Sequence, residues 1–130
     1  MDERSPRENA TSREGAKFEQ LALKYLNKQG LKLVDRNFRC RTGEIDLVMR
    51  DSEVLVFVEV RYRSRRDYGS ALESITKNKI RRIVSAARIY MSKHNLWECI
   101  VRFDAVAIQP QDNTWIRKYK IEWVKAAFEA

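Results

Sequence analysis

The sequence predicts a single α/β domain in which a mixed central sheet is covered by helices on both faces. A chain of 130 residues, 44% of them apolar and 34% charged, can form one hydrophobic core but not two. Helix-like and strand-like hydrophobic patterns alternate along this chain. The first part of one strand is apolar on both of its faces, which is typical of a strand that is covered on both sides.

The first element is predicted to be a helix that begins at Thr11 and ends before Gly30. Thr11 and Glu14 have the spacing of a capping box, and a glycine commonly follows the C-terminus of a helix. Residues 1–10 are polar with mixed charge, so we expect a flexible tail followed by one domain over residues 11–130. The apolar face of this helix recurs at helical spacing and consists of Phe18, Leu21, Ala22, Tyr25 and Leu26.

Three strands are predicted to follow the first helix. Residues 31–34 indicate the first of them, and residues 43–50 and 53–63 indicate the other two. The polar pair Asp51-Ser52 lies between the last two segments and predicts a β-hairpin. The second strand of this hairpin should be central in the sheet. One of its faces is apolar throughout, with Val54, Val56, Val58 and Val60.

The second half of the chain predicts one more helix and one more strand. A helix is expected to begin near residue 76, and a strand is expected over residues 101–109. From Trp115 onward the pattern is weaker, and we expect a short strand followed by a short helix through Ala126 and Phe128. The buried face of the expected second helix consists of Ile80, Ile83, Val84, Ala87 and Met91.

The excess positive charge is confined to one third of the chain. Of 26 Lys and Arg and 18 Asp and Glu, residues 61–93 hold 10 basic and 2 acidic side chains, whereas the rest of the chain holds 16 of each. The whole net charge of +8 therefore comes from that segment. A localised basic surface of this kind predicts a polyanionic partner such as a nucleic acid.

Several classes of protein are disfavoured by the same sequence. No apolar run approaches the roughly 20 residues that cross a bilayer, and the first residues lack the apolar region of a secretory signal. Cys40 and Cys99 are far apart and the chain has a single histidine, His94, so no zinc-site spacing is present. We expect a cytoplasmic protein with reduced thiols that does not act on a membrane.

The hairpin brings acidic residues together. A turn centred on Asp51-Ser52 places Asp46 opposite Phe57 and Glu44 opposite Glu59, so that three carboxylates lie on one face of the sheet. Opposed like charges need a compensating cation, which could be Arg61 on the same face or a hard divalent ion such as Mg²⁺. The alternative is an ordinary solvated face, with Glu44 neutralising Arg41.

One further acid is expected to reach this face. Glu19 stands at the border of the apolar face of the first helix and could extend over the edge of the sheet. A carboxylate-bound metal beside a basic surface is the arrangement that phosphodiester hydrolysis requires, because the cation polarises the phosphoryl oxygen and activates water. Arg61 could stabilise the charge that develops, but it stays protonated and cannot act as a base.

Four segments of the chain resemble the bacterial YraN-like family. They are the GEIDLV segment at residues 43–48, the VFVEVRYR segment at residues 56–63, Arg102-Phe103-Asp104, and the WVKAAF segment at residues 123–128. The resemblance extends from about residue 14 to the end of the chain. That family is similar to the PD-(D/E)XK nuclease superfamily and to archaeal Holliday junction resolvases. The resemblance therefore implies a restriction endonuclease-like αβββαβ core.

The resemblance also implies roles for individual residues. Glu19, Asp46 and Glu59 would be the metal-binding acids, with the carbonyl of Val60 as a further ligand of Mg²⁺ or Mn²⁺, and Arg61 would occupy the position of the catalytic lysine. Two departures from the pattern matter: no proline precedes Asp46, and arginine is not equivalent to lysine. The resemblance therefore implies either an active metal-dependent nuclease or a nuclease-like protein that only binds. Homodimerisation is expected only by analogy with the resolvases.

The basic segment predicts where a nucleic acid would bind. Cations at the N-terminus of a helix do not favour the helix itself, so those near residue 76 are better explained as phosphate contacts. Since no base-reading motif is present, recognition should follow the structure of the DNA or RNA. A catalytically inactive binding module and a protein-interaction domain remain alternatives. The predicted phosphate contacts are Arg63, Arg65, Arg66, Lys77, Lys79 and Arg82.

Overall fold

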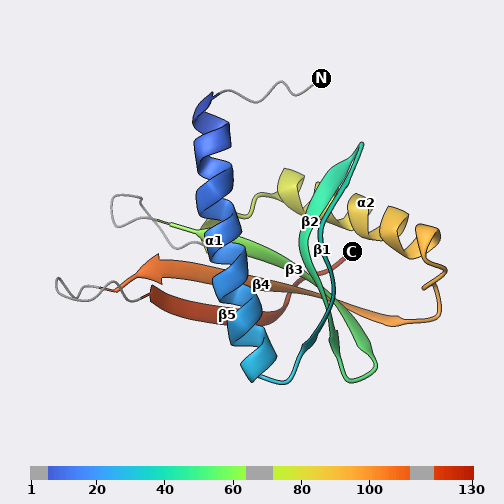
Figure 1. Cartoon of the computed structure of the whole chain (residues 1–130). Helices are drawn as coiled ribbons and strands as arrows, with labels where there is room; N and C mark the ends of the chain where they lie inside the picture. Colours follow the sequence, from blue (N-terminus) through green and yellow to red (C-terminus); the bar gives the residue numbers. More distant parts are fainter. Residues whose placement is uncertain (1–5, 64–71, 112–118) are drawn as a thin grey trace.

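The protein is a three-layer α/β domain with a five-stranded sheet between two helices (Figure 1). The computed structural model describes residues 6–63, 72–111 and 119–130, and side chains from residue 13 onward within these ranges. Neither helix in these ranges is long and apolar enough to cross a membrane. The elements are α1 (Pro6–Lys28), β1 (Lys32–Cys40), β2 (Gly43–Asp51), β3 (Val54–Tyr62), η1 (Leu72–Ser74), α2 (Lys77–Lys93), β4 (Ile100–Pro110) and β5 (Tyr119–Phe128).

The strand order is β1-β2-β3-β4-β5, and β3 is central as predicted. All neighbouring strands are antiparallel except β3 and β4, which are parallel because α2 provides the crossover between them. Helix α1 crosses one face of the sheet and α2 lies on the other (Figure 1). The predicted α/β class with a mixed sheet covered on both faces is therefore confirmed, and the element order is that of the restriction endonuclease-like core.

Helix α1 begins earlier than the sequence predicted. Its first residue is Pro6, so Thr11 lies inside the helix and not at its N-terminus. A proline suits the first turn of a helix because the main-chain N–H that it lacks would have no partner there. Gly30 has a φ of 99°, as expected for the residue that ends the helix. The predicted apolar face is confirmed, since Phe18, Ala22 and Leu26 are buried in the core.

The β2–β3 hairpin has a different register from the predicted one. Asp51 pairs with Val54, so the turn consists of Ser52 and Glu53, and Ser52 takes a positive φ of 53°. Val48 therefore faces Phe57, where the predicted turn placed Asp46. The pairing is shifted by two positions, and a shift of two leaves the paired residues, 47–51 and 54–58, on their expected faces.

The end of the chain forms a strand and not the predicted short helix. β5 pairs with β4 at the edge of the sheet, and a register shift opposite Phe103 and Ala105 marks an irregularity in the pairing. Ala126 has a φ of 51° at this irregularity. The bend brings Phe128 back onto the ring of Phe103, with 5.3 Å between ring centroids. The first part of the expected C-terminal segment, including Trp115, lies outside the described residues.

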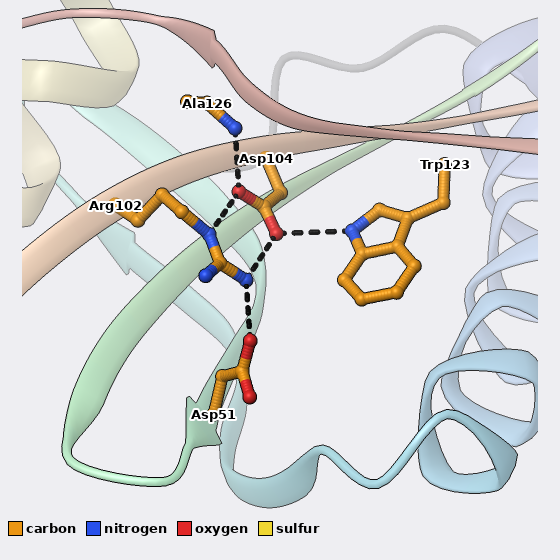
Figure 2. A network of polar contacts seen from close by, with 5 residues as sticks. All are labelled: Asp51, Arg102, Asp104, Trp123 and Ala126. Carbon is orange, nitrogen blue, oxygen red and sulfur yellow. Dashed lines mark hydrogen bonds and ion pairs between the residues drawn. The ribbon is translucent and has the colours of Figure 1, made fainter.

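A buried carboxylate fixes this irregular part of β5. Asp104 is fully buried, and Figure 2 shows the donors that surround it. Its oxygens accept hydrogen bonds from Arg102 at 2.8 and 2.9 Å, from the Trp123 indole at 3.0 Å and from the Ala126 N–H at 3.0 Å. Arg102 also contacts Asp51 at 3.0 Å, so the network joins β2, β4 and β5.

Candidate active site

The candidate site lies where β2 and β3 separate. The pairing of β2 with β3 begins at Asp51 and Val54 next to the turn and ends at Leu47 and Val58. Beyond that pair, the N–H of Val60 donates to the carboxylate of Asp46, with 2.8 Å between nitrogen and Oδ2. A side chain thus takes the place of a main-chain acceptor. The carboxylate of Asp46 therefore lies between β2 and β3 where their main-chain pairing has ended.

Three acids from three elements meet at this opening. Glu19 of α1, Asp46 of β2 and Glu59 of β3 line the same opening, and the charge of Asp46 raises the pKa of both glutamates; we call these three residues the acid cluster. Glu59 is only 5% exposed, although it is charged in most protein environments. Neighbouring carboxylates repel one another, so the charge of one disfavours ionisation of the next. Ionising all three carboxyl groups at once is therefore unfavourable.

Burial raises the pKa of all three carboxyl groups. The pKa of Glu19 rises from 4.5 to about 7, chiefly through burial and then through the charge of Asp46, while Arg36 and Asn37 oppose the rise. Burial also raises the pKa of Asp46, against which the Val60 N–H acts. The pKa of Glu59 lies well above its usual value, because burial and Asp46 outweigh the nearby cations. A group of neighbouring carboxyl groups with raised pKa values is typical of functional sites.

Two cations stand beside Glu59. The Nη1 of Arg61 is 3.6 Å from Glu59 Oε1, and its Nε donates to Ser74 Oγ at 2.8 Å. The predicted pairing of Arg61 with an acid is thus confirmed. Lys79, which the sequence suggested only as a phosphate contact, also lowers the pKa of Glu59 through its charge. Its effect on this pKa is larger than that of Arg61, and Lys79 lines the same cleft from α2.

The acid cluster lines a cleft of about 710 Å³. Glu44 lines the rim of this cleft, where it is exposed and pairs with Arg39 at 3.6 Å, whereas the alternative interpretation of the sequence paired it with Arg41. Its charge still raises the pKa of Asp46. The wall is made by the acid cluster together with residues of α1, β1, β2, β3 and α2, including Gly15, Phe18, Asn37, Arg39, Val60, Arg61, Tyr62 and Lys79.

The start of α2 is held in place by two local contacts. Thr76 is the N-cap, and its hydroxyl accepts the N–H of Lys79 at 3.1 Å, which fixes the first turn. Gly43 packs so closely on the helix that a Cβ atom there would overlap the carbonyl group of Arg82. The glycine of the GEID segment therefore allows α2 to approach β2, which brings Lys79 to the cleft.

One site residue was not predicted from the sequence. Asn37 of β1 lines the cleft and has a φ of 55°. With its amide oriented so that the nitrogen faces oxygen, it donates to both carboxylate oxygens of Glu19. A single Asn in a polar strand gives no sequence signal of this kind, although Asn is among the residues that tolerate a positive φ.

Of the other predicted phosphate contacts, those that the structure describes lie outside the cleft lining. Arg63 follows β3 and is half-buried, with its N–H bonded to the carbonyl of Ile108 at 3.1 Å. Lys77 and Arg82 are exposed on α2, outside the cleft lining. Arg65 and Arg66 lie outside the described residues. Only Lys79 of the predicted set reaches the cleft among the residues that the structure describes.

The acids are not already arranged as a closed metal cage. Within residues 6–63, 72–111 and 119–130, no group of three or more His, Cys, Asp or Glu side chains forms a metal site as it stands. The oxygen donors at the opening are nevertheless of the kind that Mg²⁺ prefers, and this ion commonly takes only one or two carboxylates with water at its other positions. Asp46, Glu59 and the carbonyl of Val60 match that requirement in type and number.

Comparison with known proteins gives consistent matches over most of the chain. The family model described as "Uncharacterised protein family UPF0102" matches residues 18–108. A UPF0102 protein of Legionella pneumophila is 46% identical over 121 residues, which are 92% of this chain and 98% of the relative. One from Aeromonas hydrophila is 50% identical over 105 residues, 79% of this chain and 81% of the relative. One from Methylococcus capsulatus is 45% identical over 116 residues, 89% and 90% of the two chains.

Proposed function

Since the chain belongs to the uncharacterised protein family UPF0102, we propose from its own site that it is a Mg²⁺- or Mn²⁺-dependent nuclease that acts on structured or branched nucleic acid. The observation that carries this proposal is the acid cluster at the opening between β2 and β3. It combines buried carboxylates with raised pKa values, a cleft, and cations from two elements.

Asp46 and Glu59 are the residues that would hold the cation. Two buried acids side by side are unfavourable unless a positive charge compensates them, and the two neighbouring cations leave all three pKa values raised. Val60 would contribute its carbonyl oxygen, and Glu19 would act from α1 directly or through a water. A bound divalent cation would polarise a phosphoryl oxygen and lower the pKa of a water ligand.

The side chains around the acids supply the remaining functions. Arg61 is fixed by Ser74 and Glu59, so its guanidinium offers a rigid positive charge to the phosphate in the transition state. Lys79 is half-buried on α2 and offers a second positive charge beside Glu59. Neither cation need act as a base, because charge stabilisation alone supports phosphoryl transfer.

The basic surface would hold the substrate. Lys77 and Arg82 are exposed on α2 next to the cleft, and Arg63 follows the strand that carries Glu59. Contacts from such side chains reach phosphates and not base edges, so they would favour the shape of a nucleic acid over its sequence. Their binding should weaken steeply with added salt.

A second candidate is a binding module that retains the fold without the reaction. The observation that favours it is Arg61 at the lysine position, already engaged with Ser74 and Glu59. An arginine in place of lysine keeps the charge but changes the geometry of every contact that the charge makes. Such a module would still bind nucleic acid after Asp46 and Glu59 had been replaced.

Cleavage assays separate these possibilities. Four-way junctions, duplexes and single strands of DNA and RNA are incubated with Mg²⁺ or Mn²⁺. The wild type should cut at least one of them, and the Asp46→Asn, Glu59→Gln double variant should not. Glu44→Gln, at the exposed rim, is the matched control and should remain active. If nothing is cut but both proteins bind in a salt-dependent way, the binding module is correct. Absence of binding at low salt would indicate a protein-interaction domain.

A further inference from the structure

Asn37 has a main-chain conformation that is unusual inside a strand. It lies in β1 with a φ of 55°, between Arg36, which pairs with Leu47, and Phe38, which pairs with Ile45. It therefore stands across from Asp46, the central member of the acid cluster. A positive φ is unfavourable for most side chains and usually marks a position where the surrounding structure requires it.

This conformation changes which helix the side chain faces. Phe38 packs on Tyr90 of α2, with 5.0 Å between ring centroids, and Asp35 also interacts with Tyr90. Arg36 instead contacts Gln20 of α1 at 3.3 Å. In a regular strand Asn37 would point to the α2 side, as Asp35 does. The positive φ of Asn37 places its side chain on the α1 side, so that Arg36 and Asn37, which are consecutive, both face α1.

The side chain of Asn37 then reaches the acid of α1. Its amide nitrogen donates to Glu19 Oε2 at 2.8 Å and to Oε1 at 3.2 Å, so both carboxylate oxygens are held by one donor group. Glu19 and Asp46 in turn line the same cleft, and the charge of Asp46 raises the pKa of Glu19. Without Asn37, a glutamate on a helix would be free to choose among several rotamers, most of them away from β2.

We propose that Asn37 is a positioning residue that fixes the carboxylate of Glu19 beside Asp46, and so joins the acid of α1 to the strand acids in one donor set. This inference rests on the proposed function in that the donor set is taken to bind a divalent cation. An amide suits the task because it donates a hydrogen bond without adding charge. A lysine here would compete with the cation, and an aspartate would repel Glu19.

A double-mutant cycle tests the inference. The four proteins are wild type, Asn37→Gly, Glu19→Ala and the double variant. Glycine accepts a positive φ, so Asn37→Gly removes the amide and keeps the conformation of β1. Any remaining effect of glycine on the main chain is common to both backgrounds and cancels in the cycle. Thermal unfolding is measured in EDTA, and Mn²⁺ binding is measured by calorimetry.

Two results are expected. In EDTA, Asn37→Gly should lower the midpoint of thermal unfolding more in the wild type than in the Glu19→Ala background. With Mn²⁺, it should weaken binding about 10-fold in the wild type and have no further effect once Glu19 is absent. Equal effects of Asn37→Gly in both backgrounds on thermal unfolding would overturn the inference. Coupling in EDTA without any Mn²⁺ binding by the wild type would instead disprove the metal-dependent function and leave the contact established.

Discussion

At the scale of single residues, the site is defined by carboxyl groups that hold protons more tightly than they do in water. Glu19 titrates at about 7 because burial and Asp46 both disfavour its charge. The pKa of Asp46 and that of Glu59 are raised for the same main reason. Near neutral pH the acid cluster therefore takes up protons easily, and a divalent cation would have to displace them to bind.

The stability of the metal-free protein should therefore depend on pH. Because Glu19 binds its proton more tightly when folded, its contribution to stability is present below the unfolded value of 4.5 and disappears as pH rises through about 7. We expect denaturation with urea in EDTA to show a more stable protein at about pH 5 than at about pH 8.5. Glu19→Gln should reduce this difference, whereas Glu53→Gln, in the exposed β2–β3 turn away from the acid cluster, should not. A wild type that gains stability over this range as pH rises would contradict the raised pKa values.

The sequence identified the acids but not their neighbours. Asp46 and Glu59 could be predicted to lie together because strand alternation tolerates the register error of two, and Glu19 because it borders an apolar helix face. Asn37 could not be predicted, since no residue pattern reports a positive φ within a strand. Lys79 could be assigned to a basic surface, but only the packing of α2 shows that it enters the cleft.

At the scale of elements, α2 matters because it carries a lysine to a site made by the sheet. If the proposed nuclease reaction takes place here, Lys79→Met should lower kcat about 100-fold with little change in KM, because it removes a charge that would lie next to the reacting phosphate. Lys77→Met, two positions earlier and outside the cleft lining, is the matched control. It should raise KM and leave kcat nearly unchanged. Steady-state cleavage kinetics on one substrate measure both, and identical effects of the two variants would exclude the distinct role of Lys79.

The approach of α2 to β2 depends on Gly43. Gly43→Ala should lower the free energy of unfolding by about 1–3 kcal/mol, because the added Cβ overlaps the carbonyl of Arg82 and forces the helix outward. In Gly15→Ala the added Cβ meets no atom within 4 Å, and this control should be neutral or more stable by up to about 1 kcal/mol. Urea denaturation provides both values. A Gly43→Ala protein as stable as wild type would show that the helix does not need this contact.

Helix and strand types were predictable where the hydrophobic pattern was long. The apolar faces of α1, β3 and α2 each extend over several repeats, and these elements are found where expected. The β5 segment was predicted as a helix because Ala126 and its neighbours favour helices. Pairing with β4 and the contacts of Asp104 override that local preference.

At the scale of the whole molecule, Asp104 holds the edge of the sheet together. Asp104→Ala should lower the free energy of unfolding by about 3–5 kcal/mol, because it leaves Arg102, the Trp123 indole and the Ala126 N–H without their buried acceptor. Asp51→Ala removes one partially exposed contact to Arg102 and should cost about 1 kcal/mol or less. Chemical denaturation of the two variants checks this difference. Equal losses would show that burial of Asp104 contributes little.

The fold places basic side chains around the cleft that contains the acid cluster. Arg39 lies on one rim of the cleft, Arg61 and Lys79 lie near its buried acids, and the exposed cations of α2 lie beside it. A nucleic acid held by these cations would present a phosphate to the acid cluster. We propose that this cluster holds a divalent cation, which would polarise the phosphoryl oxygen and activate the water that attacks the phosphate.

Calorimetric titration with Mn²⁺ tests that claim most directly. The wild type should bind the ion, Glu59→Gln should bind it at least about 30-fold more weakly because a buried ligand is lost, and Glu44→Gln should bind it as the wild type does. A wild type that does not bind Mn²⁺, or a Glu59→Gln protein that binds it with unchanged affinity, would contradict the assignment of the acid cluster as a metal site.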